Sequence, residues 1–190
     1  MEARALQTLK AMLKERGLKA DEFEQVGNPL DQTRMYTFNG VLIIFSEKTR
    51  VTDTELGNFI TFASENGHTS GTIVITPTKP SEKVLESVRR HISQPENPHL
   101  QIFYLSHLNF EYAWHRKVPK HRLVTEEEKT KLMKDLNMTK LNQLLKIDSQ
   151  DPMAKWIGAR PGDVVEVTGL DFASGEGKRW RYCLANVYEP

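Results

Sequence analysis

The sequence predicts a mixed protein of α/β and α+β class, with two units in tandem. Apolar strand-like runs separated by helical segments predict a mixed sheet with helices packed on it in the first unit. Near residue 107 the chain changes to a stretch rich in His, Lys and Arg. The length of 190 residues allows two small domains. We therefore expect an N-terminal αβ domain at 1–106 and a smaller C-terminal α+β domain at 107–190.

The first unit is expected to begin with an amphipathic helix and a β-hairpin. Apolar residues recur at helical spacing over 3–16. Asn39-Gly40 joins the strand-like runs 35–38 and 41–45, which is the strongest hairpin signal in the chain. The second run is apolar throughout, so we expect it to be buried on both faces of the sheet.

The rest of the first unit alternates helices and strands. Thr52 and Glu55 have the spacing of a capping box, which predicts a helix start. The further elements expected here are a strand at 72–76, a helix opening at 80–81 and a strand at 100–105.

The second unit carries its strongest local signals at 151–167. Asp151 is an N-cap residue, and Pro152 fits the first helical position. Gly158 is expected to end the helix in a left-handed conformation, and Gly162 to provide the positive φ of a type II turn. A strand rich in valine is then expected from residue 164.

The other elements of the second unit are predicted from caps and alternation. Thr125 and Glu128 form a second capping box. Thr139 is expected to cap a short helix that contains Leu141, Leu144 and Leu145. We expect 169–177 to form a turn-rich loop and 179–184 to form a half-buried strand.

Composition narrows the class of protein. The formal net charge of +1 argues against a dedicated nucleic-acid binder. The single cysteine, Cys183, rules out an intrachain disulfide framework and a multi-cysteine zinc site. No apolar run is long enough for a membrane span, and the first residues do not have the pattern of a secretion signal. We expect a soluble intracellular protein with no membrane partner.

A series of motifs in the second unit is typical of one protein family. The residues that carry these motifs are His115, Val118, Pro119, His121, Asp151, Pro152, Trp156, Gly158, Arg160, Gly162, Arg181 and Tyr182. In these motifs the chain is similar to the fifth subunit of multisubunit DNA-dependent RNA polymerases, a family that the eukaryotic nuclear enzymes share and that archaea also possess. The N-terminal unit matches this family more loosely, and archaeal members lack that domain, so the chain looks like the eukaryotic form or a relative from a large DNA virus. The resemblance implies that the motif residues lie at the assembly interface.

The resemblance implies a non-catalytic role. The C-terminal domain is expected to dock on the largest polymerase subunit, and the N-terminal domain to form part of the lower jaw near downstream DNA. The active site is expected on other chains, and no cofactor or metal is expected on this one. The resemblance implies a nuclear protein if the source is a cellular eukaryote. It implies a cytoplasmic or virion-packaged protein if the source is a large DNA virus.

Two basic clusters are candidates for weak, non-specific contact with downstream double-stranded DNA. Such contacts are directed at the backbone and weaken as salt rises. The cluster at 116–122 is equally compatible with a solvated loop or with docking on an acidic partner. The candidate residues are Lys79, Lys83, Arg89, Arg90, Arg116, Lys117 and Lys120.

Two rival functions stay open from the sequence. The first unit is comparable with restriction-endonuclease-like folds, so the chain is alternatively a stand-alone metal-dependent nuclease. The Asp/Glu-x-Lys patterns 127–129 and 176–178, however, lie in a predicted helix and a predicted glycine loop. His115 and His121 lack the further ligands of a zinc site. The second rival is a transcription-associated scaffold outside the polymerase.

Several other features have two readings. The 173–178 loop is longer and richer in glycine than the corresponding family loop, and we interpret it as a hairpin loop rather than a phosphate-binding loop. Trp114, Trp156 and Trp180 are either interface anchors or core residues, and core packing is at least as well supported for Trp156.

Overall fold

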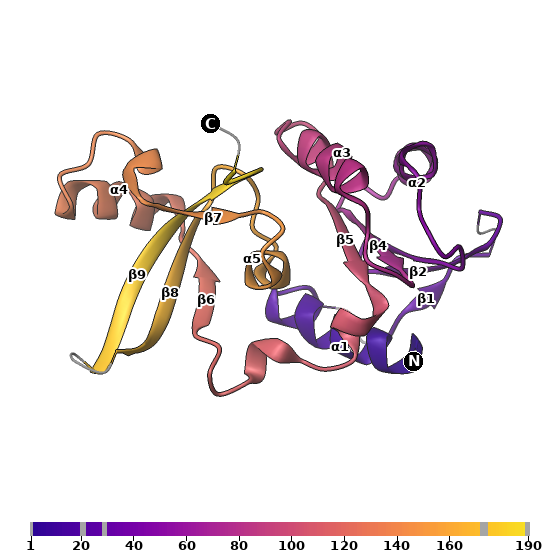
Figure 1. Ribbon diagram of the computed structural model, residues 1–190, viewed down its shortest axis with the longest axis horizontal. Helices are drawn as coiled ribbons and strands as arrows, with labels where there is room; N and C mark the ends of the chain where they lie inside the picture. The colour runs from indigo at the N-terminus through magenta and orange to yellow at the C-terminus, as the bar shows by residue number, and fades with distance from the viewer. Residues whose placement is uncertain (1, 20–21, 28–29, 172–174, 189–190) are drawn as a thin grey trace. The chain divides into compact units, whose positions relative to one another are not determined.

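The computed structural model describes residues 2–19, 22–27, 30–171 and 175–188. It divides into two compact units, Met1–Phe110 and Glu111–Pro190 (Figure 1). Within the described residues, the first unit contains a five-stranded sheet and the second a four-stranded sheet. Both sheets are mixed and carry helices, which confirms the predicted mixed αβ class.

The first unit follows the predicted order of helices and strands, with one short strand added. Its sheet has the order β1-β2-β3-β4-β5, antiparallel from β1 to β3 and parallel from β3 to β5. Strand β1 was not predicted, because two residues carry no periodic signal. The elements are α1 (Glu2–Glu15), β1 (Glu24–Gln25), β2 (Thr33–Phe38), β3 (Val41–Ser46), α2 (Asp53–Glu65), β4 (Thr72–Thr76), α3 (Glu82–Ile92), β5 (Leu100–Tyr104) and the 3-10 helix η1 (Leu105–Leu108).

The predicted hairpin is confirmed at β2 and β3. Asn39 and Gly40 both have positive φ, 49° and 79°, as a two-residue type I′ turn requires. A Cβ atom at Gly40 would lie 2.7 Å from the Ser70 Oγ atom, so a side chain at this position would force that hydroxyl to move. Every residue of β3 is buried, as its unbroken apolar sequence predicts.

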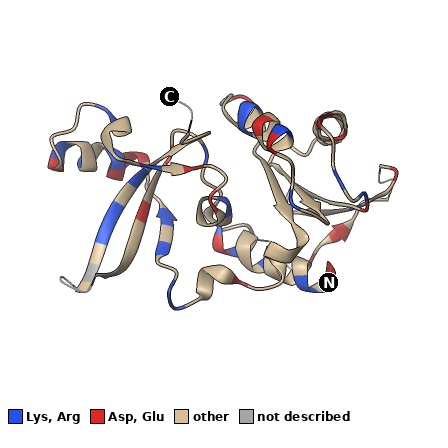
Figure 2. Ribbon diagram, viewed as in Figure 1, with Lys and Arg blue, Asp and Glu red and all other residues tan. Residues whose placement is uncertain are grey.

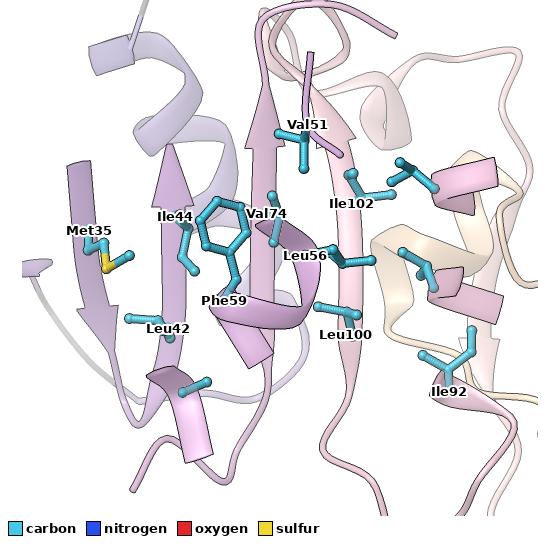
Figure 3. Close-up of a cluster of buried hydrophobic side chains, with 13 residues drawn as sticks. Met35, Leu42, Ile44, Val51, Leu56, Phe59, Val74, Ile92, Leu100 and Ile102 are labelled. Atoms are coloured by element: carbon cyan, nitrogen blue, oxygen red, sulfur yellow. The ribbon is translucent and has the colours of Figure 1, made fainter. Parts of the chain in front are cut away.

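Helices α2 and α3 bury one face of the sheet. The capping box of Thr52 and Glu55 is present at the start of α2. Figure 3 shows Phe59 of α2 and Ile92 of α3 among the sheet side chains that they cover, such as Val74. This apolar layer is one buried cluster of the first unit, and the buried residues of α1, such as Leu9 and Met12, lie outside it.

The second unit has a sheet of order β6-β8-β9-β7. Strands β6, β8 and β9 are antiparallel neighbours, and β7 runs parallel to β9. The elements are the 3-10 helix η2 (Tyr112–Trp114), β6 (Lys120–Leu123), α4 (Glu126–Asp135), the 3-10 helix η3 (Leu141–Gln143), β7 (Leu145–Asp148), α5 (Pro152–Ile157), β8 (Val164–Asp171) and β9 (Gly175–Leu184).

The helix signals of the second unit are confirmed. Asp151 accepts hydrogen bonds from the backbone N–H groups of Met153 and Ala154, at 2.8 and 3.3 Å, and so caps α5. Gly158 ends α5 with a left-handed φ of 77°. Gly162 has a φ of 97°, as predicted for its turn. The capping box at Thr125 is also present, at the start of α4.

The predicted helix at 139–145 was wrong. Only the single 3-10 turn η3 forms there, and Leu145 begins strand β7, where it pairs with Arg181 of β9. Leucine spacing in so short a segment suits a helical turn and a strand almost equally. The parallel partner strand, which lies far along the chain, decides between them.

The predicted loop at 169–177 was also wrong in most of its length. Strand β8 continues to Asp171, β9 begins at Gly175, and Gly169 pairs with Gly177 across the ladder. Glycine was interpreted as a turn signal, but here it lies within paired strands. Residues 172–174 of the predicted loop lie outside the described residues. Residues 120–123, for which a solvated loop was one of the open interpretations, form the edge strand β6.

Within the described ranges, no helix has both the length and the apolar character that a membrane crossing needs.

Candidate assembly surface and basic hollows

The two histidines of the family motif shape the turn around Pro119. The His115 Nδ1 atom accepts a hydrogen bond of 3.2 Å from the Lys117 backbone N–H. The His121 Nδ1 atom donates to the Pro119 carbonyl oxygen at 2.8 Å, since a carbonyl can only accept. Val118 closes the turn through its N–H to the His115 carbonyl, also at 2.8 Å. These contacts give both histidines a positioning role in the turn.

The described part of the chain contains no group of three or more His, Cys, Asp or Glu residues placed to hold a metal ion.

An ion-pair network fastens β6 to β8 and to α4. Arg122 and Glu166 are register partners on β6 and β8, and the guanidinium bonds both carboxylate oxygens at 3.0 and 2.8 Å. The same guanidinium bonds both oxygens of Glu128 at 2.8 and 2.9 Å. The Lys178 Nζ atom lies 3.3 Å from Glu166. One arginine therefore joins the edge strand, its neighbour and the first turn of α4.

The network shifts the pKa of each carboxylate that it holds. Burial raises the pKa of Glu166, but the hydrogen bonds from Arg122 and Lys178 outweigh it, and the net pKa is lowered. The hydrogen bonds from Arg122, and then from the Thr125 backbone, lower the pKa of Glu128 to about 2. The pKa of Arg122 is raised by its bonds to Glu128 and Glu166. All three groups are therefore charged at neutral pH.

The tryptophans lie in different environments. Trp156 is 1% exposed and packs edge to face with Tyr112, with 5.1 Å between ring centroids. Trp180 and Tyr182 pack against the buried cluster of Val124, Leu132 and Val164. Trp114 is 72% exposed. Trp156 therefore acts as a core residue that holds α5, whereas Trp114 has its ring on the surface.

The basic residues predicted in the second unit as DNA contacts line one hollow. A space of about 750 Å³ is lined by the turn before β6 and by the facing ends of β8 and β9. Arg116, Lys117 and Lys120 line it, together with Arg179, which the sequence analysis did not select. Figure 2 shows Lys and Arg along both β6 and β9. The sequence pattern that could have identified Arg179 is the alternation of basic and apolar residues in the predicted strand 179–184.

The basic candidates of the first unit separate into two places. Lys79 and Lys83 line a hollow of about 600 Å³ beside Arg50, which the sequence analysis missed. Arg89 and Arg90 lie further along α3, where Arg89 is 3.8 Å from Glu82 and Arg90 is 3.4 Å from Glu86. The structure thus brings Lys79 and Lys83 together at this hollow, while Arg89 and Arg90 are not among the residues that line it.

The remaining family-motif residues occupy the turn after α5 and the end of β9. The Arg160 carbonyl accepts from the Asp163 N–H at 3.0 Å, and the Arg160 N–H donates to the Asp163 carboxylate at 2.8 Å. Arg181 donates to the Lys146 carbonyl at 3.2 Å, which joins β9 to β7. Most motif residues thus have an identifiable role in holding the second unit together.

Comparison with known proteins matches this unit to a polymerase family. The family described as RNA polymerase Rpb5, C-terminal domain, matches residues 110–183. A protein named DNA-directed RNA polymerase subunit Rpo5 from Archaeoglobus fulgidus is 42% identical over 74 residues, which cover 39% of this chain and 96% of that protein. The protein of the same name from Sulfurisphaera tokodaii is 38% identical over 80 residues, covering 42% and 94%. The resemblance seen in the sequence is confirmed, and the chain belongs to the Rpb5/Rpo5 family of DNA-directed RNA polymerase subunits.

Proposed function

We propose that this chain is a non-catalytic subunit of a DNA-dependent RNA polymerase that docks on the largest subunit through its second unit. The first unit then forms part of the lower jaw, close to downstream DNA. Nucleotidyl transfer takes place on other chains of the same enzyme.

The proposal rests on the position of the family match along the chain. The match at 110–183 coincides with the compact unit Glu111–Pro190. The Archaeoglobus fulgidus relative is covered over 96% of its length by a segment that makes up 39% of this chain. That relative therefore consists of little besides one such unit. A contact with the rest of a polymerase that both proteins share would lie on this unit, which supports the second unit as the docking module.

The basic hollow of the first unit supports a role near DNA. It combines Arg50, Lys79 and Lys83 with the single acidic side chain of Asp53, so its described lining is positive. Hydroxyl groups, including that of Thr78, line it as well. Cationic and hydroxyl groups are the side chains that contact phosphate oxygens without reading bases. We also propose a jaw domain related to restriction-endonuclease-like folds, supported by the mixed sheet flanked by helices.

Docking is tested by cross-linking mass spectrometry on the assembled polymerase with the full-length chain. A lysine-reactive reagent should join lysines of the second unit to the largest subunit. Cross-links from these residues that reach only other subunits would contradict docking on the largest one.

The DNA contact is tested by removing two charges from the first-unit hollow. Lys79→Gln with Lys83→Gln should weaken downstream DNA binding by the assembled polymerase. The salt dependence of that binding should fall by about two charges, since each phosphate contact contributes about one. The matched control, Lys131→Gln with Lys134→Gln on α4, removes the same charge elsewhere. Equal salt dependence in both variants would show that this hollow does not meet DNA.

The rival functions gain no comparable support. The two relatives described above are named as polymerase subunits, and neither is named as a nuclease. A scaffold outside the polymerase would share the fold but would not purify with the large subunits. For the compartment, we propose the nucleus for a cellular eukaryotic source, and the cytoplasm or the virion for a large DNA virus.

A further inference from the structure

We propose that the hollow of the second unit binds an acidic, extended segment of a neighbouring polymerase subunit. We call it the basic groove and define it by Arg116, Lys117, Lys120 and Arg179 at its rim and by Gly169 and Gly177 in its floor. The inference rests on the proposed function. It adds the chemistry of the partner segment and replaces the DNA contact first considered for residues 116–120.

The floor of the basic groove is open because two glycines face each other across the sheet. Gly169 of β8 and Gly177 of β9 are register partners, and neither has a positive φ. Backbone conformation therefore does not require glycine at either position. A Cβ atom at Gly177 would meet nothing within 4 Å, whereas one at Gly169 would lie 3.2 Å from the Pro119 Cβ atom. The two glycines therefore leave space on the surface of the sheet, beside the 116–120 turn.

The charge of the basic groove selects an acidic occupant. Arg116, Lys117, Lys120 and Arg179 line it, and none of its described lining residues is acidic. The nearby carboxylate of Glu166 is bound by Arg122 and Lys178 instead. Complementary charge across an interface favours the correct partner and fixes its register.

The apolar part of the floor favours protein over nucleic acid. Val118, Pro119 and Val167 line the basic groove between the charged side chains. Apolar side chains of a partner segment gain from burial there, whereas a phosphate backbone gains nothing from such a floor. Sites for single-stranded nucleic acid usually add aromatic side chains on which bases stack, and none lines the described groove. An extended acidic segment with some apolar side chains fits both features.

The test compares three full-length variants in their ability to enter the polymerase. Arg179→Glu reverses a rim charge, and Gly177→Val fills the floor without changing any charge. Valine is favoured over glycine within a strand, so the second variant is expected to fold at least as well as the parent. Lys131→Glu, at an exposed position of α4, is the matched control for charge reversal. Thermal unfolding of each purified chain checks that all variants fold.

Each tagged variant is expressed in the native source, and polymerase recovered with it is quantified by mass spectrometry. Arg179→Glu and Gly177→Val should each reduce recovery of the large subunits about tenfold, because the first places like charges opposite each other and the second fills the space that the partner segment occupies. Lys131→Glu should recover as much as the parent. A photo-reactive benzoylphenylalanine in place of Lys117 should cross-link to a segment containing several Asp or Glu residues.

The outcomes separate the two proposals. If the parent chain recovers no large subunits, the proposed function fails. If the parent and both groove variants recover them equally, the function stands and the basic groove is not a docking site. If the variants enter the polymerase normally but weaken its DNA binding, the occupant is nucleic acid and the inference is overturned. A cross-link from position 117 to a neutral or basic segment would overturn it too.

Discussion

The Tyr112 hydroxyl donates a hydrogen bond of 2.8 Å to the Pro152 carbonyl, which ties the start of the second unit to the first turn of α5. The Tyr112 ring also packs edge to face on Trp156, one turn further along the same helix. The 3-10 helix η2 is therefore held from one side, and its last residue, Trp114, is left 72% exposed. These two contacts anchor η2 to α5.

Tyr112→Phe should lower the free energy of unfolding of the second unit by about 1 kcal/mol. The substitution removes the hydrogen bond to Pro152 and keeps the ring contact with Trp156, so the expected loss is that of one neutral hydrogen bond. Urea unfolding followed by tryptophan fluorescence measures it. Tyr188→Phe, at a side chain 89% exposed, is the control and should leave stability unchanged. An equal loss in both variants would mean that the hydroxyl of Tyr112 is not a stabilising contact.

Asp151→Ala should destabilise α5 by about 1 kcal/mol, because two backbone N–H groups lose their acceptor. For a domain of this size that loss lowers Tm by roughly 4–8 °C. Calorimetry on the full chain measures the transition. Asp135→Ala removes an exposed carboxylate at the end of α4, which is not a cap, and should not lower Tm. A Tm unchanged by Asp151→Ala would show that the cap contributes nothing.

The Arg122–Glu128 contact predicts a loss of stability in acid. Folding lowers the pKa of Glu128 from 4.5 to about 2. Between these values the unfolded state binds more protons than the folded state, so stability falls as pH falls through this window. The contribution is complete above the unfolded pKa and is absent below about pH 2. Both side chains are substantially exposed, so added salt should weaken the effect.

Urea midpoints measured from neutral pH down to the folded-state pKa test this behaviour. Glu128→Gln should reduce the fall of the urea midpoint in acid, because the carboxylate whose pKa folding lowers is gone. Glu127→Gln removes a carboxylate from the same turn of α4 and should leave that fall unchanged. An equal reduction by the two substitutions would show that the Arg122–Glu128 contact does not cause the loss of stability in acid.

Cys183 should react with thiol reagents only when the second unit opens. Its side chain is fully buried, and burial raises the pKa of the thiol to about 12, with smaller contributions from nearby aspartates such as Asp163. Because the chain contains a single cysteine, labelling with a chromogenic disulfide reports this site alone. Labelling should be slow in native buffer and complete within the mixing time in denaturant. Rapid labelling of the native chain would contradict a closed core around β9.

The parts of the fold that local chemistry determines were predicted correctly. The caps at Thr52, Asp151 and Gly158 act within one turn of helix, and the Asn39-Gly40 turn acts within one hairpin. A few neighbouring residues of the sequence are therefore enough to predict them. Strands β6 and β7 were missed because their few residues become strands by pairing with distant partners. The basic groove depends on the register of Gly169 with Gly177, which brings Arg179 to the 116–120 turn. A short sequence pattern does not predict the register between two strands, so the basic groove could not be predicted from the sequence.

Membership of a polymerase is tested by the stoichiometry of the proteins that purify with this chain. The full-length chain is tagged in its native source and purified at moderate salt, and the bound proteins are quantified by mass spectrometry. We predict the two largest polymerase subunits at one copy each per copy of this chain, with RNA synthesis in the eluate. Recovery of the chain without large partners and without RNA synthesis would contradict that membership.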